Sequence, residues 1–142
     1  MPLEHLFDPE LRYRHDAEPL VSGEGRAGRL VGSGEGAVEG SRVAGSLRWT
    51  LFEVPGDLVC VMEPVAVIET EDGARIDLEA RGHARRSTVQ DRVWKVAAAL
   101  RFESADERYG WLDEALGVWE GEFDADALRA RYRAYLQTAR AT

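Results

Sequence analysis

The sequence predicts a mainly β protein, a closed antiparallel barrel or tight sandwich followed by one α-helix. Roughly seven or eight short apolar or alternating segments are separated by turn residues. An Asp-Gly pair at 72–73 stands between two β-rich runs, which is a strong hairpin signal. Glycines recur at 28, 32, 34, 36, 40 and 45, and small closed barrels use such glycines to turn corners. The 142 residues contain no repeat or linker, so one domain spanning 1–142 is expected.

The hairpin around Asp72-Gly73 is the centre of this prediction. Its first arm, Leu58–Ile68, is apolar at both odd and even positions, which indicates a strand covered on both faces. Its second arm alternates between apolar residues such as Ile76 and Leu78 and charged ones, which indicates one wet face.

The other segments are assigned by the same patterns. Strands are expected at Met1–Tyr13, Ser46–Val54, Val93–Phe102 and Gly117–Phe123. His15–Gly28 is expected to be a loop or a ragged edge strand, and His83–Asp91 a loop. A helical turn is expected at the start of Tyr109–Leu116.

A C-terminal helix is predicted for residues 124–139, packed on the barrel. Asp124 is placed to cap it, and Phe123 with Leu128 has the spacing of a hydrophobic staple. Its apolar stripe is formed by Leu128, Tyr132, Tyr135 and Leu136.

Composition excludes several function classes. A net charge of −8 and a pI near 4.9 argue against nucleic acid, which requires a basic patch. No apolar run is long enough to suggest a membrane partner, and the one cysteine, Cys60, fits a reducing compartment. A cytoplasmic protein is therefore expected.

No cofactor and no metal are expected. Gly32, Gly34 and Gly36 are spaced by two and do not form the dinucleotide fingerprint G-x-G-x-x-G. The three histidines have no metal-ligand spacing, and there is no G-x-S-x-G elbow for a serine nucleophile. Cys60 lies in an apolar run, where a thiol more often packs as a small hydrophobe than acts as a nucleophile.

Two carboxylates are the candidate catalytic groups. Glu63 shares strand parity with four valines, and if that face lines the barrel, burial raises its pKa to the range of a general acid or base. The alternative is an ion pair with an arginine such as Arg48 or Arg101, or a bulge at Pro64 that turns Glu63 to solvent. Glu53 is the second candidate, placed at a strand end beside a turn.

The four tryptophans are either core residues or the platform of a ligand site. They stand at positions 49, 94, 111 and 119.

Three segments carry a family resemblance. GSGEGAVEGSRVAG followed by Trp49, the hairpin ETEDGARIDLEARG, and RFESADERYGWLDEALGVWEG resemble the DUF3237 (UPF0311) family of small bacterial β-barrel proteins. Phe102, Tyr109, Trp111 and Leu112 match its C-terminal motif, with Asp113 at a position that is usually Asn. The chain departs from the family at Arg48, where many members carry an acidic residue.

The resemblance implies a lipocalin-like barrel, often dimeric, whose interior holds a small organic molecule. A few members of the family resemble epoxide hydrolases that act on aromatic polyketides. The expected partners are therefore a small apolar organic molecule and, as a possible assembly, a homodimer.

The resulting functional hypothesis is cofactor-free acid–base chemistry, such as epoxide opening, cyclisation or isomerisation, on an apolar or polycyclic substrate. Glu63 and Glu53 are the predicted catalytic residues. The predicted substrate contacts are Trp49, Arg48, Tyr109, Trp111 and Trp119. A non-catalytic carrier with the same cavity and a dimeric structural barrel are the alternatives. A filled interior would favour the structural barrel.

Overall fold

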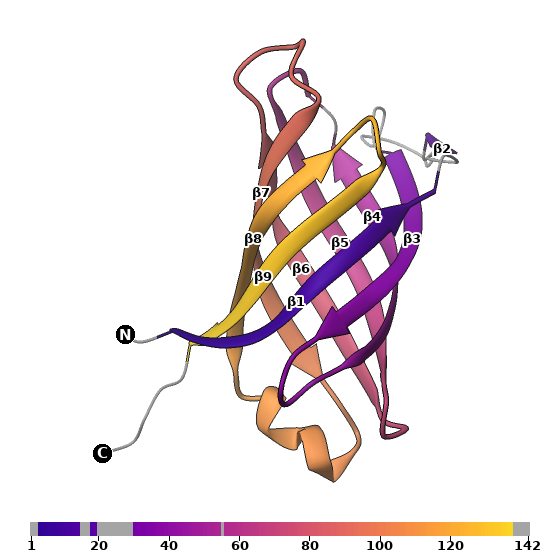
Figure 1. Ribbon diagram of the computed structural model, residues 1–142, viewed down its shortest axis with the longest axis vertical. Coiled ribbons are helices and arrows are strands. Elements are labelled where there is room, and N and C mark those ends of the chain that lie inside the picture. The colour runs from indigo at the N-terminus through magenta and orange to yellow at the C-terminus, as the bar shows by residue number, and fades with distance from the viewer. Residues whose placement is uncertain (1–2, 15–17, 20–29, 55, 138–142) are drawn as a thin grey trace, which may run out of the picture.

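The computed structural model describes residues 3–14, 18–19, 30–54 and 56–137, and their strands form a closed antiparallel barrel (Figure 1). The sheet order β1-β9-β8-β7-β6-β5-β4-β3 is closed into a ring by the pairing of β1 with β3, and the short β2 pairs with β3. The strands are β1 (Leu3–Tyr13), β2 (Glu18–Pro19), β3 (Leu30–Glu39), β4 (Gly45–Val54), β5 (Val59–Thr70), β6 (Arg75–Arg85), β7 (Val93–Glu103), β8 (Leu116–Asp124) and β9 (Arg129–Gln137).

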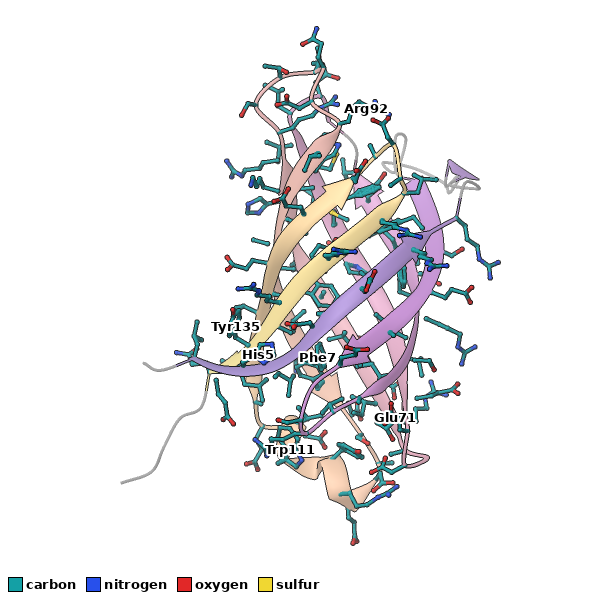
Figure 2. The ribbon with its side chains drawn as sticks, in the orientation of Figure 1. His5, Phe7, Glu71, Arg92, Trp111 and Tyr135 are labelled. Atoms are coloured by element: carbon teal, nitrogen blue, oxygen red, sulfur yellow. The ribbon has the colours of Figure 1, made fainter. Side chains whose placement is uncertain are left out.

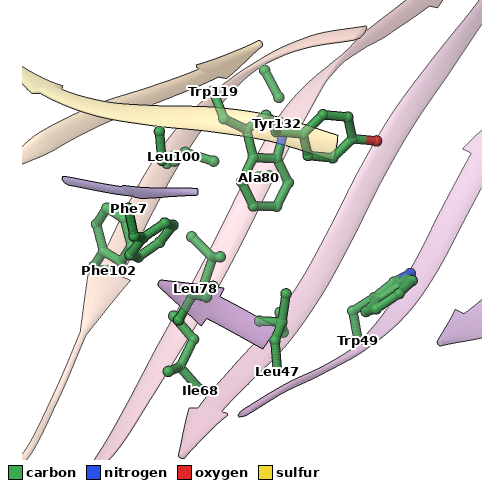
Figure 3. Close-up of a cluster of buried hydrophobic side chains, with 14 of the residues drawn as sticks. Phe7, Leu47, Trp49, Ile68, Leu78, Ala80, Leu100, Phe102, Trp119 and Tyr132 are labelled. Atoms are coloured by element: carbon green, nitrogen blue, oxygen red, sulfur yellow. The ribbon is translucent and has the colours of Figure 1, made fainter. Parts of the chain in front are cut away.

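Alternating residues of each strand fill the interior of the barrel. On β6 the side chains of Ile76, Leu78 and Ala80 point inward, while the charged residues between them face solvent. Figure 3 shows the result, a cluster in which side chains from β1, β4, β5, β6, β7, β8 and β9 meet. The predicted hairpin turn at Asp72-Gly73 is confirmed, and Gly73 has the left-handed φ of 88° that favours glycine.

The first hairpin arm, β5, is not covered on both faces within the single chain. Its inward residues Met62, Ala66 and Ile68 are buried. Its outward valines are not: Val59, Val61 and Val65 are 43–48% exposed. The prediction of two covered faces was wrong because continuous apolar character does not by itself distinguish an interior face from an exposed apolar one.

The predicted C-terminal helix is also wrong, since residues 129–137 form β9, which closes the barrel between β8 and β1. Ala130, Tyr132, Ala134 and Leu136 are buried, and three arginines alternate with them on the outer face. The stripe from Leu128 to Leu136 fits a helical period, but the alternation of arginine with apolar residues fits period two better. The Asp124 carboxylate does accept hydrogen bonds, from the amides of Asp126 and Ala127, but these stabilise the turn between β8 and β9.

One glycine in β3 makes room for a core tryptophan. Gly34 pairs with Trp49 across the β3–β4 ladder. A Cβ at Gly34 would overlap the Trp49 ring and the carbonyl of Arg12. The indole therefore occupies space that any side chain at position 34 would need.

A 3₁₀ helix, η1 (Glu107–Leu112), covers one end of the barrel, at the bottom of Figure 1. Its Leu112 is fully buried, and its Tyr109 hydroxyl donates to both carboxylate oxygens of Asp72 at 2.8–2.9 Å. Asp106 caps the helix by accepting from the amide of Arg108 at 2.9 Å. The hydrogen bonds between Tyr109 and Asp72 thus connect η1 to the hairpin turn at this end of the barrel.

Substituting Ala134 tests the strand assignment of residues 129–137. Ala134 is fully buried in β9, whereas on a helix it would lie off the predicted apolar stripe. Ala134→Asp should therefore destabilise the protein by more than about 3 kcal/mol, because it buries an unpaired charge. Chemical denaturation measures this, with Arg133→Ala on the exposed face as the matched control. Equal stability of both variants would contradict the barrel role of β9.

Candidate functional site

Five half-buried side chains gather at the end of the barrel opposite η1. They lie at inward positions close to the ends of five strands, where solvent still reaches the interior. We call them the rim cluster: Tyr13 of β1, Glu53 of β4, Cys60 of β5, Trp94 of β7 and Phe123 of β8.

The carboxylate of the rim cluster is Glu53. It follows Trp49 and Leu51 on the inward face of β4, and burial raises its pKa. Burial raises the pKa values of Tyr13 and Cys60, and the negative charge of Glu53 raises both further. Among carboxylates of the described residues, Asp72 and Asp106 have lowered pKa values instead, because hydrogen bonds stabilise their charged forms.

Tyr13, Cys60 and the aromatic rings of the rim cluster share this end of the barrel with Glu53. Burial raises the pKa of Tyr13 to about 12, so this phenol is protonated at neutral pH. The Cys60 thiol donates to the carbonyl of Gly56 at 3.6 Å, and burial raises its pKa as well. The Tyr13 ring meets Phe123 edge to face at 4.6 Å, and the Arg86 guanidinium lies 4.3 Å from the ring centre of Trp94.

Below the rim, Trp49 and Tyr132 form the floor of the site. The hydroxyls of Tyr13 and Tyr132 share a hydrogen bond of 3.4 Å, and burial raises the pKa of Tyr132 well above its ordinary value. Both rings line a void of about 20 Å³, room for about one water molecule. Trp49 also lines it, and its buried Nε1–H has no hydrogen-bond partner within the described part of the chain. This end therefore has unused hydrogen-bonding capacity.

Sequence reasoning missed Tyr13, Phe123 and Tyr132 as site residues. Tyr13 continues the inward parity of Phe7 and Leu11, a signal that was available in the alternation of β1. Tyr132 lies in the segment for which the sequence predicts a helix and which forms β9.

The structure places Glu63, the leading catalytic candidate, outside the barrel. Its carboxylate lies 3.5 Å from the guanidinium of Arg81, whose side chain is 80% exposed. The reason is the register, since Glu63 pairs with the outward Phe52 of β4. The ion-pair alternative is the correct one, although the partner is Arg81 and neither Arg48 nor Arg101.

The other predicted contact residues do not form one site. Arg48 also lies outside the barrel, where it pairs with Glu69 at 2.6 Å, away from the rim cluster. Tyr109 and Trp111 lie on η1, and Figure 2 shows Trp111 at that end of the barrel. The Arg42 guanidinium stacks on the Trp111 ring at 3.7 Å. Trp119 is an interior residue that packs on Tyr132 at 5.0 Å between ring centres. Of the predicted site residues, Trp49 and Glu53 lie on the inward face of β4 at the rim-cluster end.

A broad depression that runs across β3, β1, β9, β8, β7 and β6 is a weaker candidate. Its lining carries charges of both signs in a cross-strand ladder, including Lys95 with Glu122 and Arg131 with Glu10. These opposite charges pair with each other in contact with solvent, which is typical of an ordinary solvated surface.

Neither a metal cluster nor a spanning helix is found in the part of the chain that the structure describes. No group of three or more His, Cys, Asp or Glu side chains among those residues is placed to hold a metal ion. No helix there has the length and hydropathy needed to cross a membrane.

Comparison with known proteins shows the fold. A β-barrel-like protein from Acinetobacter baumannii is similar with a TM-score of 0.78 and 18% identity over 95% of this chain and 94% of the other. A conserved protein of unknown function from Rhodopseudomonas palustris matches with a TM-score of 0.78 and 20% identity over 95% and 96%. An enzyme from Penicillium herquei matches with a TM-score of 0.63 and 19% identity over 96% and 94%. A scan of protein-family models and a search of curated proteins give no match.

The contact between Asp72 and Tyr109 predicts acid sensitivity at the η1 end. Hydrogen bonds from Thr70 and Tyr109 lower the pKa of Asp72. A lowered folded-state pKa contributes stability above the unfolded value of about 3.9, which is lost as the pH falls through the folded value. Tyr109→Phe should therefore lower the Tm most above about pH 4, with the difference from the unmodified protein shrinking toward pH 2.

Thermal melts between pH 2 and pH 7 measure this difference, with Tyr135→Phe on the outer face as control. Melting curves of Tyr109→Phe that parallel those of the unmodified protein across the acid range would contradict the role of this contact.

Proposed function

We propose that this protein binds a small apolar organic molecule at the rim cluster and acts on it by cofactor-free acid–base chemistry. The observation that carries the proposal is Glu53, a carboxylate turned inward at a barrel end, whose pKa is raised by burial. Stability alone favours an apolar residue at such a position, because a desolvated carboxylate costs free energy. A carboxyl group with a raised pKa is the group that general acid–base catalysis near neutral pH requires.

The neighbours of Glu53 define the chemistry that it would serve. The phenol of Tyr13 is in its neutral form, and when it accepts from the Tyr132 hydroxyl its own O–H can donate to a substrate oxygen. In epoxide opening, Glu53 would give its proton to the epoxide oxygen as the C–O bond breaks, while a solvent water molecule forms the new C–O bond and then returns a proton to the Glu53 carboxylate. In cyclisation or isomerisation, its ionised form would take a proton from the substrate.

The aromatic residues of the rim cluster favour an apolar, ring-containing ligand. Trp94 and Phe123 pair across the β7–β8 ladder and present half-buried rings next to Tyr13. The void beneath them holds only about 20 Å³, so the ligand is placed at the barrel end and the floor supplies hydrogen bonds. The likeness to an enzyme from Penicillium herquei is compatible with such a role.

Family membership and location belong to the same proposal. We place the chain in the DUF3237 family, which is supported by the way its motif residues Asp72, Tyr109 and Leu112 meet at the η1 end. The free, half-buried Cys60 supports a reducing, cytoplasmic location.

The filled interior favours a second candidate function. The interior void has room for about one water molecule, so the barrel could also be a structural unit whose function is to associate with another protein. Turnover at the rim cluster distinguishes the two functions.

Replacing Glu53 by Gln tests the catalytic proposal, because it removes the titration and keeps the shape. With a panel of aryl epoxides as probes and loss of epoxide followed by NMR, Glu53→Gln should reduce turnover by about a hundredfold or more. Its stability at neutral pH should be equal or higher, since a buried charge is removed.

Glu63→Gln, on the outer face, is the matched control and should keep full turnover. Unchanged turnover in Glu53→Gln would contradict the proposed role. Binding of the probes without turnover by the unmodified protein would favour a carrier.

A further inference from the structure

We propose that the void beneath the rim cluster binds one oxygen atom of the ligand and thereby selects ring systems that carry a carbonyl group. The inference rests on the proposed function, because it concerns the same apolar molecule at the same end of the barrel and names the group by which that molecule is recognised. Three polar side chains that line the void form the site: Tyr13, Trp49 and Tyr132. We call them the oxygen subsite.

The indole of Trp49 supplies the observation that carries the proposal. Trp49 is 6% exposed, and its Nε1–H has no hydrogen-bond partner within the described part of the chain. A buried donor without a partner costs free energy, and native structures pair nearly all such groups. In Figure 3 the indole nitrogen of Trp49 and the hydroxyl of Tyr132 lie on the side of the cluster that faces away from Phe7 and Phe102. An acceptor atom in the void that Trp49 lines would pair this donor.

The hydroxyls of the oxygen subsite add a second donor. Tyr13 and Tyr132 share one hydrogen bond of 3.4 Å, in which one hydroxyl donates and the other accepts, so one O–H stays available. Burial raises the pKa of both phenols, so both keep their protons at neutral pH. The oxygen subsite therefore offers two donors to a bound atom, the Nε1–H of Trp49 and one phenol O–H.

A neutral carbonyl oxygen fits these donors. It has two lone pairs and no proton, so it accepts from the indole and from the phenol at the same time. An amine brings further donors, and a hydroxyl brings a proton that needs an acceptor of its own. A carboxylate brings a charge that burial penalises, and no lysine or arginine is among the described residues that line the void. His83 also lines it, but the alternation of β6 places its side chain on the outer face.

The size of the void determines how such a ligand lies. About 20 Å³ accommodates one oxygen atom but no ring, so the ring system stays at the rim cluster. Tyr13 belongs to both parts, since its ring meets Trp49 at 5.1 Å and Phe123 at 4.6 Å, edge to face in both cases. A ketone at the edge of a fused ring system, as in α-tetralone, places its oxygen inward and its ring against these aromatic side chains.

Paired binding titrations of α-tetralone and tetralin test the proposal, because the two molecules differ only in the carbonyl group that replaces one methylene. The unmodified protein should bind α-tetralone about tenfold more tightly, which is the contribution of one or two buried hydrogen bonds. Tyr13→Phe/Tyr132→Phe removes both hydroxyls and keeps both rings, so it should reduce this preference to about threefold or less while tetralin binds as before. Tyr135→Phe on the outer face of β9 is the matched control and should keep the full preference.

NMR of the indole N–H groups locates the interaction in the unmodified protein. The Trp49 resonance is assigned through its nuclear Overhauser contacts with the Tyr13 ring. It should move downfield with α-tetralone, because the N–H then donates to the carbonyl, and it should not do so with tetralin.

The outcomes separate this inference from the proposed function. Equal affinity for the two compounds would overturn the oxygen subsite and leave the apolar site at the rim cluster in place. The same holds for a Trp49 resonance that contacts an internal water only and does not respond to α-tetralone. If neither compound bound, the proposed function would fail together with this inference.

Discussion

Closure of the sheet is the constraint on which the rest of this structure depends. Because β1 pairs with both β9 and β3, every strand of the ring has two neighbours, and each outward or inward assignment is fixed by the register. The register separates the two candidate carboxylates. Glu53 pairs with the buried Met62 and points inward, whereas Glu63 pairs with Phe52 and points outward. A pairing difference of one residue decides which of them meets the interior.

The two ends of the barrel then take different roles. At one end, the buried Leu112 fills the interior. The hydrogen bonds between the Tyr109 hydroxyl and the Asp72 carboxylate hold η1 in place, so these polar groups are already paired with each other. At the other end Glu53 lies among neutral donors and half-buried rings, and the Nε1–H of Trp49 has no partner in the described chain. Polar groups without partners are what a ligand site offers, which is why we propose the function at the rim cluster.

Much of the fold could be predicted from the sequence, because local signals were sufficient there. The Asp72-Gly73 turn and the alternation after it specify a hairpin, and turn residues mark most strand ends. The C-terminal segment failed because Tyr132 and Leu136 satisfy both a helical and a strand period. The segment is a strand because the barrel requires one between β8 and β1, and this requirement cannot be recognised from the local sequence pattern.

The site was harder to predict, because it depends on which face of each strand is inside. Glu63 stood out in the sequence as a charge among valines, yet those valines are themselves exposed. In the sequence Glu53 is the weaker candidate because it lies at a strand end, but a strand end is where a closed barrel lets solvent reach inward residues. The rim residues Tyr13 and Phe123 come from opposite ends of the sequence, and only barrel closure brings them together.

The central claim is that the Glu53 carboxyl group is partly withdrawn from water at the barrel end. NMR titration of the protein with ¹³C-labelled glutamate side chains, with Glu53→Gln used to assign the resonance, measures its pKa in the folded state. The account predicts a pKa clearly above the ordinary glutamate value of 4.5. A pKa at or below that value would contradict it, because Glu53 would then be solvated or paired like a surface carboxylate.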